Sequence, residues 1–152
     1  MKVCIMRHGE AGFSASSDSS RSLTKYGCEQ ASKAGLWLRQ QNFQFDLGLV
    51  SPYIRAQQTL EQLSSHASIF QVETNKALVP GGDPAQVVNR LIESLMSNIK
   101  SVIVVSHLPL VGYLVNELCP DVSPPMFATA AIACIDLSSD VVGKLEWFHQ
   151  AG

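Results

Sequence analysis

The sequence predicts an α/β protein built as a three-layer α/β/α sandwich around a mainly parallel sheet. Strand and helix patterns alternate over most of the 152 residues, which is typical of this class. Residues 3–6 and 102–105 are apolar at every position, as expected of strands that helices cover on both faces. No repeat, low-complexity run or linker divides the chain, so we expect residues 1–152 to form a single domain.

The first half of the chain is expected to fold into alternating strands and helices. In order, these are a strand at 3–6, a loop at 9–23, a helix at 24–40, a strand at 47–50, a helix around 56–63 and a strand at 69–72. The loop is rich in Gly, Ser and Asp and shows no periodicity. Thr24 is a suitable N-cap for the first helix, and Ser51-Pro52 ends the second strand.

The second half continues the alternation and ends in two strands. Asp83 is expected to cap a helix that has Pro84 at its first position. The apolar stripe of that helix consists of Val88, Leu91, Ile92, Leu95 and Ile99. The remaining elements are a strand at 102–105, a helix that begins at Pro109, and strands near 128–137 and 142–148 joined by a turn at 138–140.

Composition excludes several classes of partner. Lys and Arg number 11 against 13 Asp and Glu, so no cationic surplus exists to bind a nucleic-acid backbone. The four cysteines lack metal-ligand or redox spacing, and reduced thiols with no metal are expected. Arg7 follows the N-terminus too soon for a signal peptide, and the weakly polar stretch 126–135 is too short to cross a bilayer. We expect a cytoplasmic monomer without a membrane partner.

Cationic and nucleophilic side chains follow three of the expected strands. Arg7-His8-Gly9-Glu10 follows the first strand, Arg55 comes shortly after the second, and His107 follows the strand at 102–105. Ligands bind at this edge of parallel sheets, so we expect two guanidiniums and two imidazoles to meet there. Guanidiniums match phosphoryl oxygens and an imidazole is a suitable nucleophile, which together favour phosphoryl transfer. His66 and His149 are expected to be structural.

The order and spacing of these residues also resemble a known family, the histidine phosphatase superfamily, which includes phosphoglycerate mutases and many phosphatases. The motifs that carry the resemblance are Arg7-His8-Gly9, Ser51-Pro52-x-x-Arg55-Ala56-x-Gln58-Thr59 and His107. The short chain and the stretch Ser17-Asp18-Ser19-x-Arg21-x-Leu23-Thr24-x-x-Gly27 are similar to SixA-type phosphohistidine phosphatases along nearly the whole sequence. The resemblance implies a phosphoglycerate mutase-like fold and a hydrolase that needs neither metal nor cofactor.

The resemblance further implies a role for each matching residue. His8 would be the nucleophile that accepts the phosphoryl group. The phosphate site would consist of Arg7, Gly9, Arg21, Arg55 and His107. The implied partner is a protein that carries phosphohistidine, such as a histidine-containing phosphotransfer domain in signal transduction.

One departure from the family pattern bears on the substrate. Larger members that cleave phosphate esters are similar in carrying a carboxylate proton donor on an inserted segment, whereas the corresponding residues 78–84 are brief and Leu108 follows His107. An alkoxide leaving group needs that proton, but imidazole, whose conjugate acid has a pKa of about 6.5, does not. Cleavage of a P–N bond is therefore favoured. The alternatives are a small-molecule phosphomonoesterase or mutase with Glu10 or Asp18 as the acid, and a phospho-ligand binding module without turnover.

Overall fold

One six-stranded sheet forms the middle of the computed structural model, which describes residues 1–150. The strands are β1 (Lys2–Arg7), β2 (Gln44–Val50), β3 (Ser68–Thr74), β4 (Ser101–Ser106), β5 (Ile132–Leu137) and β6 (Gly143–His149). Their order across the sheet is β3-β2-β4-β1-β5-β6. The first four of these pair in parallel, and β5 and β6 add an antiparallel edge. The expectation of a mainly parallel sheet is confirmed.

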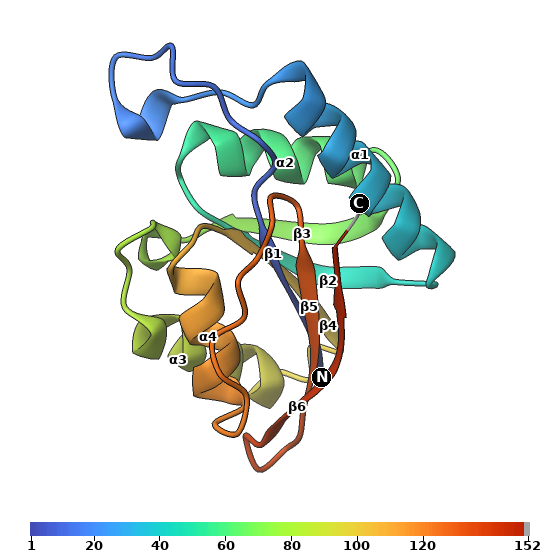
Figure 1. Cartoon of the computed structure of the whole chain (residues 1–152). Coiled ribbons are helices and arrows are strands. Elements are labelled where there is room, and N and C mark those ends of the chain that lie inside the picture. The colour runs from blue at the N-terminus through green and yellow to red at the C-terminus, as the bar shows by residue number, and fades with distance from the viewer. Residues whose placement is uncertain (151–152) are drawn as a thin grey trace.

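Helices cover both faces of the sheet and complete the expected α/β/α sandwich. Figure 1 shows α1 (Lys25–Gln40) and α2 (Ile54–Ser64) on one face, with α3 (Pro84–Met96) and α4 (Leu110–Leu118) on the other. Two short 3₁₀ helices, η1 (Asp18–Ser20) and η2 (Lys76–Leu78), lie in the connecting segments. Thr24 accepts a hydrogen bond from the backbone N–H of Gly27, and Asp83 accepts one from Ala85, so both expected N-caps are present.

Two apolar cores hold the layers together, one on each face of the sheet. All six residues of β4 are buried, as the unbroken apolar run of this strand predicts. Val102 and Val104 pack toward α3 and α4, whereas Ile103 and Val105 pack toward α1 and α2. Each fully buried Val or Ile side chain contributes roughly 1.5–3 kcal/mol through burial. The central strands are therefore a rigid support for the residues that follow them.

Several element boundaries differ from the sequence expectation, among them the start of β2, which lies at Gln44 instead of residue 47. Helix α3 ends at Met96, so Ile99 packs against the core from beyond its end. Pro109 is the N-cap of α4 and not its first residue. Strand β5 begins only at Ile132, because Ala130 has a φ of 62° and its N–H bonds to the carbonyls at the end of β1. None of these shifts alters the topology.

The parallel register brings the ends of three strands to one edge of the sheet. Arg7 at the end of β1 is paired with Ser106 at the end of β4, and Val50 at the end of β2 is paired with Val105. The residues that follow these strands must therefore emerge beside one another. Among the four α-helices of the described chain, none has the length and apolar character needed to cross a bilayer.

Candidate active site

His8 lies directly after β1 and is almost buried, with 7% of its surface exposed. Its Nδ1 is 2.6 Å from the carbonyl oxygen of Gly9, which can only accept, so Nδ1 carries the proton. Nε2 is left with its lone pair and accepts a hydrogen bond of 3.3 Å from Nε of Arg55. Burial, together with the nearby charge of Arg55, lowers the pKa of His8 to about 4. The ring is therefore neutral and nucleophilic at pH 7.

Gly9 holds this arrangement by packing closely against the first turn of α1. A Cβ at position 9 would lie 2.6 Å from the carbonyl oxygen of Gly27, so only glycine fits. The N–H of Gly9 donates to Oγ1 of Thr59, which in turn donates to the carbonyl of Arg55. The atoms that exclude a side chain at position 9 therefore belong to the backbone of Gly27. This contact fixes the carbonyl that orients His8.

Arg55 comes from the first turn of α2 and is 4% exposed. While its Nε contacts His8, its Nη1 donates to the carbonyl of Asp18 at 2.6 Å and its Nη2 lies 3.2 Å from the Asp18 carboxylate. All three nitrogens of the guanidinium fork thus contact either His8 or Asp18. Such a fork is suited to holding two oxygens of a phosphoryl group.

Arg7 supplies a second guanidinium from the end of β1. Its Nη1 donates to the carbonyl of Phe127 at 3.0 Å, while its buried Nε has no hydrogen-bond partner among residues 1–150. Burial and the neighbouring charge of Arg55 both lower the pKa of Arg7. Two cations held close together in a partly buried site favour the binding of an anion.

His107 follows β4 and faces His8 across the site. The two ring centroids are 5.1 Å apart and the rings are tilted by 57°. Nε2 of His107 lies 2.7 Å from Oγ of Ser51, and the ring is 1% exposed. Burial lowers the pKa of His107 to about 3, and the charges of Arg55 and of His8, which is itself protonated at such a low pH, act in the same direction. The structure thus brings together Arg7, His8, Arg55 and His107 from three strand ends.

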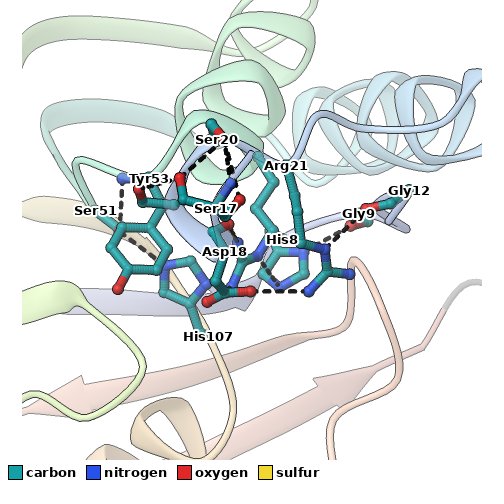
Figure 2. Close-up of polar contacts among 12 residues, drawn as sticks. His8, Gly9, Gly12, Ser17, Asp18, Ser20, Arg21, Ser51, Tyr53 and His107 are labelled. Atoms are coloured by element: carbon teal, nitrogen blue, oxygen red, sulfur yellow. Dashed lines mark hydrogen bonds and ion pairs between the residues drawn. The ribbon is translucent and has the colours of Figure 1, made fainter. Parts of the chain in front are cut away.

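Asp18 and Arg21 lie at the mouth of the site, in the segment before α1. The Asp18 carboxylate bridges Arg21 and Arg55, as Figure 2 shows for its contact with Arg21. Arg21 also donates to the carbonyl of Gly12 and lies over the ring of Phe13. Arg21 is therefore held at the rim of the site, where it borders the same pocket as His8.

Of the two carboxylates considered as a proton donor, Asp18 is poorly suited to that role. The hydrogen bond from Arg21 lowers the pKa of Asp18, with Arg55 adding to the effect, so this carboxylate is ionised at neutral pH. Glu10 is exposed and accepts a hydrogen bond from the hydroxyl of Thr24. Glu10 also lines a pocket of about 450 Å³, which is bordered by His8, Arg21 and the exposed ring of Phe13.

Some residues of the site were missed by the sequence interpretation. Ser51 and Thr59 belong to the motif around Arg55, but their contacts with His107 and Gly9 follow only from the fold. The carbonyl of Phe127 reaches Arg7 from a distant loop, and a backbone atom leaves no signal in sequence. Within residues 1–150, no three His, Cys, Asp or Glu side chains are grouped in a way that could hold a metal ion.

The buried imidazoles predict that acid destabilises the fold. In the unfolded chain they take up protons near the ordinary pKa of 6.5, whereas His8 and His107 in the folded protein do so only near about 4 and about 3. Protons therefore bind preferentially to the unfolded state below pH 6.5. The stability is complete above that pH and is lost as the pH falls toward the folded-state values. Urea titrations at several pH values should show this decline, and His107→Gln should make it shallower; an equally steep decline in His107→Gln contradicts the assignment.

Comparison with known proteins places the chain in a family. The family model of the histidine phosphatase superfamily (branch 1) matches residues 3–79. The chain is 44% identical over 148 residues to phosphohistidine phosphatase SixA of Escherichia coli (strain K12), covering 97% of this chain and 92% of that protein. It is 40% identical over 141 residues to a phosphohistidine phosphatase SixA homolog of Haemophilus influenzae, covering 88% and 86% of the two chains.

A solved structure gives the same result for the fold. The structure of the protein histidine phosphatase SixA complexed with tungstate superposes with a TM-score of 0.95 at 44% identity, covering 97% of this chain and 96% of that chain. The sequence-based expectation of a phosphoglycerate mutase-like fold is confirmed by this match. From the family model and these relatives, the chain belongs to the histidine phosphatase superfamily.

Proposed function

We propose that this chain is a phosphohistidine phosphatase, which removes the phosphoryl group from a phosphorylated histidine of another protein through a phospho-His8 intermediate. The observation that carries the proposal is the neutral Nε2 of His8, set beside Arg55 and facing His107 in a cationic site. Two relatives that are 44% and 40% identical over most of this chain are named for that activity. One of the similar structures holds tungstate, an oxyanion that resembles phosphate.

In the first step the lone pair on Nε2 of His8 attacks phosphorus. The P–N bond of the substrate breaks, and a proton taken by the substrate ring from solvent lets it leave as neutral imidazole. Arg7, Arg55 and His107 hold the equatorial oxygens of the transferring group, where negative charge must be stabilised. The proton stays on Nδ1 of His8, where it is hydrogen-bonded to the carbonyl of Gly9. The phosphorylated ring is therefore a cation.

In the second step water attacks phosphorus from the side vacated by the leaving imidazole. The P–N bond to His8 returns its electron pair to Nε2, a proton passes from water to solvent, and inorganic phosphate leaves. The cationic ring is a good leaving group, so this step also needs no carboxylic acid. The ionised state of Asp18 fits the same scheme, because it has no proton to donate.

The proposed substrate explains the shape of the site. A phosphohistidine on a protein surface must reach His8 from outside, and the pocket beside His8 is open and bordered by Phe13, which is 83% exposed. The partner we propose is a histidine-containing phosphotransfer domain of a cytoplasmic signalling pathway. We further propose that residues 1–152 act as a single, monomeric histidine phosphatase domain and that the cations of Arg7, Arg21 and Arg55 act in place of a metal.

A substrate panel tests the proposal. The enzyme is expected to release phosphate rapidly from a phosphohistidine protein, and slowly from a phosphoserine peptide or p-nitrophenyl phosphate, with unchanged rates in EDTA. Faster cleavage of the esters than of phosphohistidine contradicts the proposal and favours a phosphomonoesterase. Binding of the phosphoprotein without phosphate release contradicts it in favour of a binding module. Loss of turnover in EDTA contradicts the metal-independent mechanism.

A further inference from the structure

Ser51 is a buried hydroxyl placed against the second histidine of the site. It follows β2 immediately and has no exposed surface. Its N–H donates to the carbonyl of Val105 in β4, and its carbonyl accepts from Nε2 of Gln57. These backbone contacts leave the side chain little freedom. They hold Oγ beside the residue that follows β4, which is His107.

The hydrogen bonds of Oγ define the direction of its contact with His107. The N–H of Tyr53 donates to Oγ at 3.1 Å, which uses one lone pair of the hydroxyl. Nε2 of His107 lies 2.7 Å away and is the one acceptor that the described residues offer to the hydroxyl proton. Figure 2 shows the chain of contacts from Tyr53 through Ser51 to His107. Both groups are satisfied when Ser51 donates to Nε2.

The direction of this hydrogen bond fixes where the proton of His107 lies. A neutral imidazole that accepts at Nε2 carries its proton on Nδ1. Nδ1 of His107 is buried and has no hydrogen-bond partner within residues 1–150. In the opposite tautomer Nδ1 would be a bare lone pair, unable to donate to a phosphoryl oxygen. The hydroxyl proton of Ser51 would then lack an acceptor in the buried site.

We propose that Ser51 is a positioning residue that holds His107 in the Nδ1–H tautomer, so that His107 enters the reaction as a hydrogen-bond donor to the phosphoryl oxygens. The catalytic part of this inference rests on the proposed function, whereas the tautomer is a property of the free protein. The two imidazoles then have opposite roles in the site, one as a lone-pair nucleophile and the other as a proton donor in a hydrogen bond. A carbonyl makes His8 an Nε2 nucleophile, and a hydroxyl makes His107 an Nδ1 donor.

The free protein tests the tautomer without reference to activity. Long-range ¹H–¹⁵N correlation spectra at pH 7 are expected to show a protonated Nδ1 and an unprotonated Nε2 for His107, with His107→Gln identifying the resonances. In Ser51→Ala the two nitrogen shifts should move toward each other as the tautomers mix. A protonated Nε2 in the unsubstituted protein, or unchanged shifts in Ser51→Ala, overturns the inference.

Kinetic measurements test the catalytic role of Ser51. Ser106 offers a matched control for these measurements. Ser106 is equally buried at a strand end, but its hydroxyl donates to the carbonyl of Leu78, away from both imidazoles. Ser51→Ala is expected to lower kcat for phosphohistidine hydrolysis by about 10- to 100-fold, the range found when a hydrogen-bond partner that orients a metal-bound histidine is removed, with a smaller change in KM. Ser106→Ala should leave the His107 shifts and kcat unchanged. A kcat in Ser51→Ala equal to that in Ser106→Ala overturns the catalytic role, even if the tautomer is as expected.

Discussion

Replacement of His8 by Ala is expected to lower kcat/KM for phosphohistidine hydrolysis by roughly 10⁴- to 10⁶-fold, the range seen when a nucleophile is removed. The remaining cations of the site still bind the phosphoryl group, so the substrate affinity should fall far less than kcat. No other side chain can replace the nucleophile, because the facing His107 has its Nε2 in contact with Ser51. Steady-state rates on a phosphohistidine protein give the comparison.

A trapping experiment shows whether His8 forms a covalent bond to the phosphoryl group during turnover. Rapid quenching of the unsubstituted enzyme with ³²P-labelled substrate should give acid-labile, base-stable label on the peptide that contains His8, and His8→Ala should give none. His66→Ala is the control, since His66 is a partly buried histidine whose ring contacts Ser32, outside the site. Activity of His8→Ala within tenfold of His66→Ala, or label at another residue, contradicts the mechanism.

The edge of the sheet where the site lies could be predicted because buried parallel strands leave a strong signal. Residues 3–6 and 102–105 are apolar at every position, and a histidine stands two residues after the end of each run. The parallel register then places the two strand ends side by side, as the pairing of Arg7 with Ser106 shows. Local capping rules likewise identified Thr24 and Asp83, because an N-cap depends on only a few neighbouring residues.

The contacts that tune the site could not be predicted in the same way. The segment over residues 9–23 has no periodicity, so nothing in it indicated that Asp18 bonds to Arg55. The left-handed conformation of Ala130, which delays the start of β5 to Ile132 and lets the N–H of Ala130 bond to the end of β1, depends on tertiary contacts that override local preference. The direction of the Ser51 hydroxyl likewise depends on Tyr53 and His107 together.

The second large effect on activity is expected at Arg55, where substitution by Lys should lower kcat/KM nearly as much as substitution by Gln. Either substitution should lower kcat/KM by about 10³-fold, a value typical of an arginine that stabilises a transferring phosphoryl group. Arg55 uses Nε for His8 and both terminal nitrogens for the Asp18 segment, so its planar fork spans the site. A lysine ammonium is a single point and cannot reproduce two parallel contacts. Arg90→Lys is the control, because Arg90 makes a similar two-point contact with Glu73 outside the site.

The same variants separate the charge of Arg55 from its shape. The positive charge of Arg55 is one of the causes that hold the pKa of His8 at about 4, after burial. Removal of the charge in Arg55→Gln should therefore raise the pKa of His8 toward its ordinary value, whereas Arg55→Lys should leave it low. NMR titration of His8 in the two variants measures this difference. Loss of activity in Arg55→Lys with the pKa of His8 still low would mean that phosphoryl transfer depends on the geometry of the guanidinium. Full activity in Arg55→Lys would instead show that a positive charge alone is sufficient, and the assigned role of the fork would be wrong.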